Sequence, residues 1–335
     1  MDMYLDLIEQ GYLMSTKHPT ADLWLFNYTA KTQYEKAWNA ITLSCRGLIL
    51  DKNGQVMASP FPEFFNIEEH QTAEIPNLPF EVFEKMDGSL GILYWLNDKP
   101  FIATRGSFAS EQALKATDWL HSIYADCIPK IQKDVTYLFE IIYPENKIVV
   151  DYGDIQGLFL LALIDNKTGQ DLPLENIGFP IVKRYDGVSD LKELKQRNIP
   201  NNEGYVLRFQ NGFRVKVKFE DYVRLHRIMT QFSNLSVWEN LSTGTPFEEL
   251  LERVPDEFYD WVKATKIELE NKYLEIENEC KNAFKAFESR KEAALYFKNQ
   301  KYPSVLFLML DGKDYSSNIW RIIQPTFSKP YRSDF

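Results

Sequence analysis

Lys85 is the residue whose surroundings best suit covalent chemistry. It lies in the segment EKMDGSLG, between two runs of apolar and β-branched residues that are typical of strands. A neutral lysine amine is a nucleophile, and nearby cations lower the pKa of such an amine. The segment therefore has two interpretations: an exposed lysine beside a Gly-Ser hairpin, or a lysine that attacks a nucleotide phosphate.

Cations alternate with apolar residues in FRVKVKF, residues 213–219. Successive side chains of a strand point to opposite faces, so Arg214, Lys216 and Lys218 would share one face. This pattern also has two interpretations, a lysine fringe in solvent or a pair of cations presented to phosphate.

Two carboxylates occur in apolar surroundings. Glu140 lies within LFEII, and Glu203 stands directly before Gly204 and an apolar strand. Burying such a group is costly unless it is paired, hydrogen-bonded or metal-bound. Arg46 and Arg105 add cations, each at a strand end beside a glycine.

Strands and helices that would position these residues can be predicted along the chain. Runs of β-branched and aromatic residues, several bounded by Gly, Asn or Asp, predict strands at Cys45–Leu50, Phe80–Lys85, Leu90–Leu96, Phe101–Arg105, Thr136–Tyr143, Lys147–Val150, Leu158–Ile164, Tyr205–Phe209 and Phe213–Lys218. Helical spacing of apolar residues predicts helices over 109–124, Ser189–Arg197 and Glu220–Thr230. A longer helical pattern with an apolar stripe, from Phe258 to Phe287, follows after Gly244 and Pro246. The fold class predicted is α+β, with a mixed domain over residues 1–234 and an all-helical domain over 235–335.

Composition narrows the class of protein. Hydrophobic residues are 44% and charged residues 26%, close to an average globular chain, so a core is available. Three widely spaced cysteines argue against a disulfide framework and indicate a reducing compartment. The first residues lack the pattern of a signal peptide and no run is long and apolar enough for a membrane span, so we expect a cytoplasmic protein without a membrane partner. A net charge of −10 argues against indiscriminate nucleic-acid binding but allows a small basic cleft that prefers RNA ends.

Five segments in order resemble the covalent nucleotidyltransferase superfamily of polynucleotide ligases and capping enzymes. They are Lys85-Met86-Asp87-Gly88, Arg105-Gly106-Ser107, Phe139-Glu140, Glu203-Gly204 and Lys216-Val217-Lys218. Together with CRGLILDKNG, FFNIEE, RGSFASEQA and FEIIYPENKIVVDY, they make the chain from about Trp24 to His226 similar to the RNA ligase 1 family of phage-type, ATP-dependent RNA ligases. The helices that follow, in place of a β-rich domain, favour this family.

The resemblance implies a nucleotidyltransferase domain of antiparallel sheets and helices, followed by the helical domain. It implies that Lys85 takes AMP from ATP, with Mg²⁺ or alternatively Mn²⁺, and passes it to a 5′-phosphate RNA end that a 3′-hydroxyl then joins. RNA repair, including repair of broken tRNA, is the implied setting. The chain has no kinase P-loop, so an end-healing kinase or phosphatase would be a separate chain.

The resemblance also implies roles for individual residues. Lys85, Asp87, Lys216 and Lys218 would be catalytic, with Lys216 and Lys218 gripping the α-phosphate and Asp87 and Glu140 orienting the ribose or the lysine. Glu203 would hold metal-bound water, and Gly88 would let the backbone approach the nucleotide. The remaining nucleotide-binding residues would be Tyr28, Arg46 at the triphosphate tail, Phe65, Glu84, Arg105 and Tyr222.

Two positions depart from the family pattern. Glu63 stands directly before Phe-Phe-Asn, where the family has a lysine that helps to bind the leaving pyrophosphate, and Arg105 stands where a close relative has lysine. The second change is mild, although the geometry of the two cations differs. The first leaves open a non-catalytic RNA-end-binding protein with the same fold. A nucleotidyltransferase that uses GTP or seals DNA is a further alternative.

Overall fold

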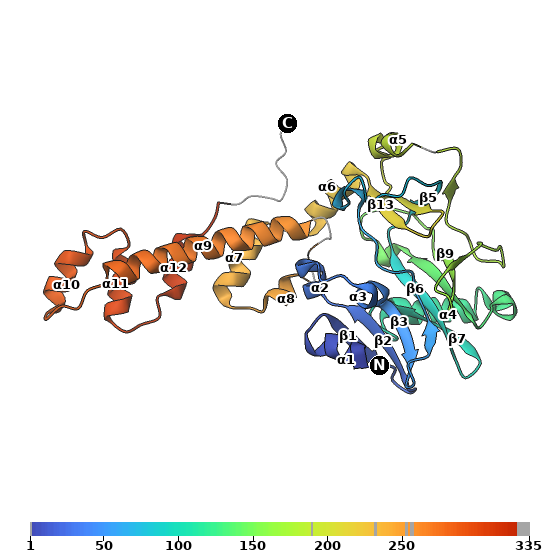
Figure 1. Cartoon of the computed structure of the whole chain (residues 1–335), viewed down its shortest axis with the longest axis horizontal. Coiled ribbons are helices and arrows are strands. Elements are labelled where there is room, and N and C mark those ends of the chain that lie inside the picture. The colour runs from blue at the N-terminus through green and yellow to red at the C-terminus, as the bar shows by residue number, and fades with distance from the viewer. Residues whose placement is uncertain (1, 189, 231–232, 252–253, 255–257, 327–335) are drawn as a thin grey trace. The chain divides into compact units, whose positions relative to one another are not determined.

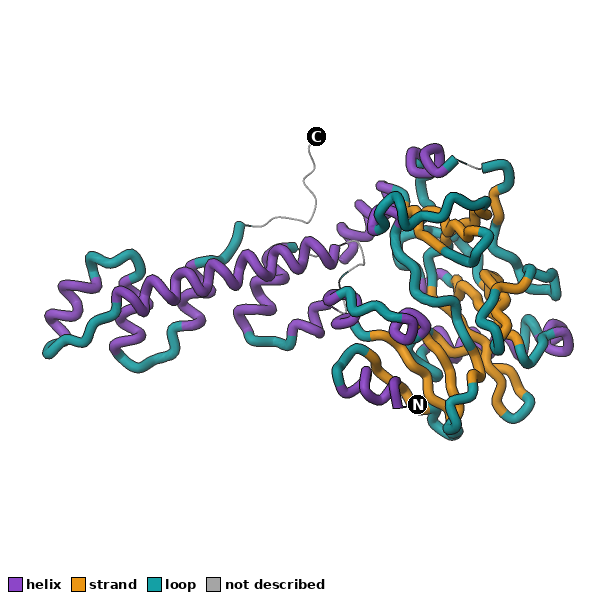
Figure 2. The backbone as a smooth tube through the Cα atoms, in the orientation of Figure 1, coloured by secondary structure: helices purple, strands orange, loops and turns teal. Residues whose placement is uncertain are grey.

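The computed structural model describes residues 2–188, 190–230, 233–251, 254 and 258–326. The chain divides into two compact units, Met1–Met229 and Thr230–Phe335. Within the described residues, all strands belong to the first unit and the second contains helices and loops (Figure 2). This confirms the α+β class with a helical C-terminal part, and the predicted division at residue 234 falls close to the end of the first unit.

Three antiparallel sheets build the first unit (Figure 1). In order across the first sheet, the strands are β1 (Leu13–Lys17), β2 (Leu23–Tyr28), β3 (Arg46–Asp51) and β4 (Val56–Ala58). The second sheet contains β10 (Asp171–Leu172), β9 (Gly157–Asp165), β8 (Val135–Ile142), β6 (Ser89–Leu96) and β7 (Lys99–Thr104). The third contains β11 (Arg184–Tyr185), β5 (Phe80–Lys85), β12 (Gly204–Phe209) and β13 (Arg214–Lys218).

Short helices connect and cover these sheets. They are α1 (Asp2–Glu9), α2 (Ala30–Glu35), α3 (Ala40–Ser44), α4 (Glu111–His121), α5 (Leu191–Gln196) and α6 (Glu220–Thr230), with 3-10 turns η1 (Ile67–Glu69), η2 (Ala125–Lys130) and η3 (Pro144–Asn146). Helix α4 begins where the Ser110 hydroxyl accepts a hydrogen bond from the Ala113 N–H, which caps the helix.

The second sheet lies between two apolar layers. On β8, Tyr137, Phe139 and Ile141 pack in the same core as Trp119 of α4. Leu138, which points to the other face, packs in a core that includes Leu25 and Ile49 of the first sheet. The third sheet has a core of its own, to which Val215 and Val217 contribute. The strands that carry the candidate site are therefore fixed by packing on their apolar faces.

Most predicted strands and helices are confirmed, and most of their ends lie within one or two residues of the predicted ends. The predicted strand Lys147–Val150 is wrong, because this segment is a loop whose Val149 and Val150 N–H groups donate to the Asp87 carboxylate and not to a neighbouring strand. Strands β1, β2, β4, β10 and β11 were not predicted. The helix predicted over Ser189–Arg197 corresponds to α5, although Ser189 lies outside the described residues.

The second unit is an assembly of helices. They are α7 (Asn234–Thr243), α8 (Phe247–Leu251), α9 (Tyr259–Ala283), α10 (Arg290–Phe297), α11 (Pro303–Leu310) and α12 (Ser316–Ile322). Ile276 and Cys280 of α9 pack with the last three helices in one core. The helix ends at Ala283, so Phe287 of the predicted stripe lies in the following loop, yet its ring still packs against this core.

Within the part of the chain that the structure describes, no helix combines the length and apolarity needed to cross a bilayer. Cys45, Cys127 and Cys280 are buried free thiols.

Candidate active site

Lys85 lies at the crossover between two sheets. It is the last residue of β5 in the third sheet, and the chain passes through Met86–Gly88 directly into β6 of the second sheet. Its side chain is only 20% exposed, and its Nζ lies 2.7 Å from Glu203 Oε1. The interpretation as an exposed hairpin lysine is therefore wrong.

The cations of β13 line one buried face. Val215 and Val217 pack into the core of the third sheet, while Lys216 and Lys218 point the other way with side chains 6% and 10% exposed. Lys218 Nζ lies 3.9 Å from the same oxygen of Glu203 that pairs with Lys85. The predicted alternation is confirmed, and a solvent fringe is excluded as its explanation.

Glu63 joins a second group of cations. Lys216 Nζ lies 2.8 Å from its Oε1, and Arg46 Nε lies 2.6 Å from its Oε2. The Tyr28 hydroxyl donates to Oε2 at 2.8 Å and accepts a hydrogen bond from Arg105 Nη1 at 3.1 Å. The residue that departs from the family pattern thus lies at the centre of the predicted phosphate-binding side chains.

Glu140 connects the two groups of cations, those that pair with Glu203 and those that pair with Glu63. Its Oε1 accepts a hydrogen bond from the Gly88 N–H at 3.0 Å. Burial raises the pKa of Glu140 to about 8, against the opposing effects of the nearby Lys85 and Arg46 cations. Burial also raises the pKa of Glu203, although Lys85 and Lys218 act in the other direction. Glu140 thus contacts the backbone of the Lys85 crossover, close enough to both groups for their cations to affect its pKa.

Asp87 holds the loop after β8 in place. Its Oδ2 accepts hydrogen bonds from the Val149 and Val150 N–H groups, each at 2.8 Å, and its Oδ1 accepts one from the Tyr222 hydroxyl at 2.8 Å. The Asp87 N–H donates to the Tyr152 hydroxyl at 2.8 Å. This carboxylate ties the crossover to the loop and to α6.

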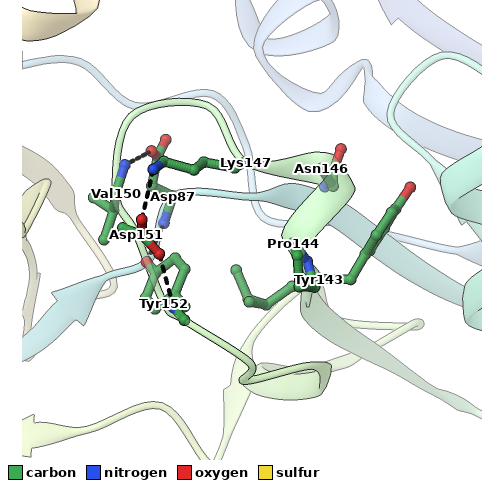
Figure 3. A pocket seen from close by; sticks show the side chains of 10 residues that line it. Asp87, Tyr143, Pro144, Asn146, Lys147, Val150, Asp151 and Tyr152 are labelled. Carbon is green, nitrogen blue, oxygen red and sulfur yellow. Dashed lines mark hydrogen bonds and ion pairs between the residues drawn. The ribbon is translucent and has the colours of Figure 1, made fainter.

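A cavity of about 180 Å³ lies beside Asp87 (Figure 3). Its lining comes mostly from the loop after β8, including Asn146, Lys147 and Tyr152. Lys147 pairs with Asp151 at 2.7 Å, so the loop has its own ion pair at the rim.

Two glycines are required by close packing around the site. A Cβ on Gly88 would lie 2.7 Å from the Ile141 carbonyl oxygen of β8, so the glycine permits the crossover to approach β8 closely. The predicted approach of a nucleotide to Gly88 stays a prediction. Gly204 has φ +149°, and a Cβ there would lie 2.0 Å from the Val217 carbonyl oxygen. These two close contacts place Lys85 and Glu203 against their neighbouring strands.

Glu84 and Phe65 differ in their relation to this cluster. Glu84 precedes Lys85 in the strand and projects from the opposite face, where it interacts with Lys183, so the structure does not bring its side chain to the cluster. Phe65 does adjoin it: its carbonyl accepts a hydrogen bond from the Lys216 N–H at 2.9 Å, and its ring lies 5.1 Å from that of Trp38.

Sequence reasoning missed Tyr152, Asn146 and Trp38. The Asn146 amide donates to the Ser89 hydroxyl at 3.0 Å and fixes the start of β6. Tyr152 follows the apolar run that was mistaken for a strand, and nothing in its sequence context indicates that it bonds to Asp87. The Trp38 ring lies 5.0 Å from that of Tyr28.

A half-buried lysine beside buried cations and carboxylates, at the junction of two antiparallel sheets, defines a site suited to nucleophilic attack on phosphate. Residues 44–222 match a family model described as RNA ligase. The match covers more than half of the chain, which therefore belongs to the RNA ligase family.

Similar proteins carry related names. The chain is 25% identical over 263 residues to a protein of Autographa californica nuclear polyhedrosis virus with the provisional name of bifunctional polynucleotide kinase/RNA ligase, an alignment that covers 70% of this chain and 38% of that protein. It is 28% identical over 224 residues to a protein of Thermovibrio ammonificans provisionally named RNA ligase, with 62% of this chain and 57% of that protein covered. The chain thus spans less than two thirds of the length of these relatives. A Naegleria gruberi RNA ligase structure with PPi aligns with a TM-score of 0.36 at 19% identity, over 44% of this chain and 52% of that one.

Proposed function

We propose that the protein is an ATP-dependent RNA ligase that joins 5′-phosphate and 3′-hydroxyl RNA ends through a lysyl-AMP intermediate on Lys85. The observation that carries the proposal is the position of Lys85, 2.7 Å from Glu203 and beside the buried cation Lys218, in a chain of the RNA ligase family. The site contains the nucleophile, an acceptor for its proton and cations for a phosphate.

In the first step the amine must lose its proton before it attacks. Glu203 Oε1 is within hydrogen-bond distance of Lys85 Nζ, and the raised pKa of this buried carboxyl makes it a better proton acceptor than an exposed glutamate. A nitrogen–phosphorus bond then forms at the α-phosphorus of ATP. The bond from that phosphorus to the bridging oxygen breaks, and pyrophosphate leaves with the electron pair.

The β13 cations act on the phosphate. Lys216 and Lys218 project from the same face beside Glu203 and Glu63, so both are positioned to stabilise charge that develops on phosphate oxygens. In the later steps AMP passes from Lys85 to the 5′-phosphate of RNA, and the 3′-hydroxyl displaces AMP to close the backbone.

The acidic side chains suit Mg²⁺, or Mn²⁺ in its place. Among the described residues no three His, Cys, Asp or Glu side chains are grouped as a protein-only metal site requires. Mg²⁺ does not need such a group, because it commonly binds one or two carboxylates together with phosphate oxygens and water. Glu203, beside Lys85, is the carboxylate that would hold its bound water. When bound, the ion would neutralise charge on the phosphate oxygens.

Asp87 and Tyr222 hold the crossover that carries Lys85 in place. Their hydrogen bond connects the crossover to α6, and the loop N–H groups complete the carboxylate's bonding. We assign both to positioning Lys85. Tyr28 and Arg105 similarly hold Glu63 and the cations around it.

RNA repair is the proposed setting, with broken tRNA among the candidate substrates. The three buried free thiols support a reducing compartment such as the cytoplasm.

The proposal is tested by incubating the protein with ATP and Mg²⁺, followed by RNA that carries a 5′-phosphate. We expect adenylylation with ATP in preference to GTP, and sealing of RNA in preference to DNA. Adenylylation without sealing of any end would contradict the ligase proposal, while preference for GTP or DNA would assign another nucleotidyltransferase specificity.

A second candidate is a non-catalytic protein that binds RNA ends. Glu63 favours it, because this carboxylate neutralises Arg46 and Lys216 within the site. This alternative predicts RNA binding that persists in Lys85→Ala and no covalent nucleotide on the native protein.

A further inference from the structure

Glu63 occupies a place that an oxyanion of a ligand would occupy. Its side chain is 4% exposed, and its two oxygens contact Lys216 Nζ, Arg46 Nε and the Tyr28 hydroxyl. Two cations and a hydroxyl donor around a buried carboxylate form the kind of environment that binds a phosphate oxygen.

The backbone fixes this carboxylate in position. The Glu63 N–H donates to the Leu43 carbonyl at 2.8 Å, and two residues further on the Phe65 carbonyl accepts from the Lys216 N–H at 2.9 Å. Asn66 forms a single parallel bridge with Lys216. Glu63 is thus attached to β13 through its backbone neighbours as well as through its ion pair.

A nucleotide bound at Lys85 would extend to the cations around Glu63. Lys216 and Lys218 lie two residues apart on one face of β13, a separation of about 7 Å, which a triphosphate chain can bridge. Lys85 and Lys218 already share Glu203 as their counterion, while Lys216 and Arg46 share Glu63. A polyphosphate with its α-phosphorus at Lys85 therefore competes with Glu63 for cations.

We propose that Glu63 is a built-in competitor of the polyphosphate, which weakens binding of ATP and pyrophosphate and protects lysyl-AMP from reversal by pyrophosphate. The inference rests on the proposed function. In the reverse reaction a pyrophosphate oxygen attacks the phosphorus of lysyl-AMP, the phosphorus–nitrogen bond breaks, the Lys85 nitrogen takes a proton and ATP is released. Pyrophosphate must first displace Glu63 from Arg46 and Lys216, so low concentrations leave the intermediate intact.

Asp171 offers a matched control. Its carboxylate, like that of Glu63, lies between two cations, here Arg208 at 3.3 Å and Arg214, and its side chain is 18% exposed. Asp171→Asn therefore neutralises a carboxylate that is paired with two arginines and not with Lys216. Glu63→Gln removes the charge of Glu63 with little change of shape, and Glu63→Ala also removes its hydrogen-bonding atoms.

The experiment loads each protein with radiolabelled AMP, removes free nucleotide and titrates pyrophosphate while ATP release is followed. We expect the half-saturating pyrophosphate concentration of Glu63→Gln and Glu63→Ala to fall at least about tenfold below that of the wild type, the lower range for coupling between close charge pairs. The KM for ATP in the loading reaction should fall in parallel. Asp171→Asn should match the wild type, and thermal melting identifies any variant that fails to fold.

Equal half-saturating concentrations in the wild type and a folded Glu63 variant would overturn the inference while leaving the lysyl-AMP reaction in place. A similar decrease in Asp171→Asn would also overturn it, because the effect would then be general to the ion pairs of this unit. Failure of the wild type and all folded variants to form lysyl-AMP would overturn the proposed function, and the inference with it.

Discussion

Replacement of Gly88 by alanine tests how the crossover positions Lys85. The new Cβ would lie 2.6 Å from Ile142 Cδ1, 2.7 Å from the Ile141 carbonyl oxygen and 3.2 Å from Glu140 Cγ. The Ile142 methyl can rotate away, but the Ile141 carbonyl belongs to the backbone of β8, between β6 and β9. The crossover itself must therefore move, and Lys85, three residues earlier, moves with it.

The contact of the new Cβ with the Ile141 carbonyl oxygen sets the expected loss of stability. Overpacking of a tight interior site typically costs about 1–3 kcal/mol. In a unit of this size each kcal/mol lowers the melting temperature by about 2–4 °C, so Gly88→Ala should melt about 2–12 °C below the wild type. Displacement of a reacting group by about 1 Å can reduce a rate about 100-fold, and we expect a comparable loss in the rate of lysyl-AMP formation.

Gly106→Ala is the control, because a Cβ at Gly106 would meet nothing within 4 Å and the residue does not need a left-handed backbone. Its stability should stay within about 0.5 kcal/mol of the wild type. Differential scanning fluorimetry and a single-turnover adenylylation assay measure both effects. If Gly88→Ala melts at the same temperature as the wild type and is adenylylated at the same rate, the proposed role of this contact is refuted.

Two further changes probe buried groups of the site. The pKa of Glu140 is raised to about 8 from an ordinary value of 4.5, so between these pH values the folded protein holds a proton that the unfolded chain has lost. The wild type should therefore lose stability relative to Glu140→Gln as the pH rises from 5 to 9. Thermal melts measure this loss, and parallel curves of melting temperature against pH for the two proteins would contradict it. Tyr222→Phe removes one donor from the buried Asp87 carboxylate and should cost about 1–3 kcal/mol in denaturant unfolding, whereas an unchanged midpoint would show that this bond does not stabilise the fold.

Local patterns in the sequence were sufficient to predict much of the site. The alternation along FRVKVKF placed Lys216 and Lys218 on one face because the strand period is two, and the apolar face of the same strand is indeed buried. The positions of Glu140 and Glu203 in apolar surroundings indicated that they would need partners, and both interact with Lys85 or its crossover.

Contacts between distant segments could not be predicted in this way. The run around Val149 and Val150 has strand composition, but its N–H groups bind a carboxylate some sixty residues earlier in the chain. Sequence alone likewise identified Glu63 as a departure without showing that Arg46, Lys216 and Tyr28 converge on it. These pairings depend on how three sheets pack together, which local propensity does not encode.

The assignment of Lys85 as the nucleophile is tested most directly by the intact mass of the purified protein after incubation with ATP and Mg²⁺. Protein treated first with pyrophosphate, to remove any AMP already attached, is compared with Lys85→Ala treated in the same way. We expect the wild type to gain the mass of one adenylyl group and Lys85→Ala to gain none. No gain on the wild type, or an equal gain on Lys85→Ala, would contradict the assignment of Lys85 as the nucleophile.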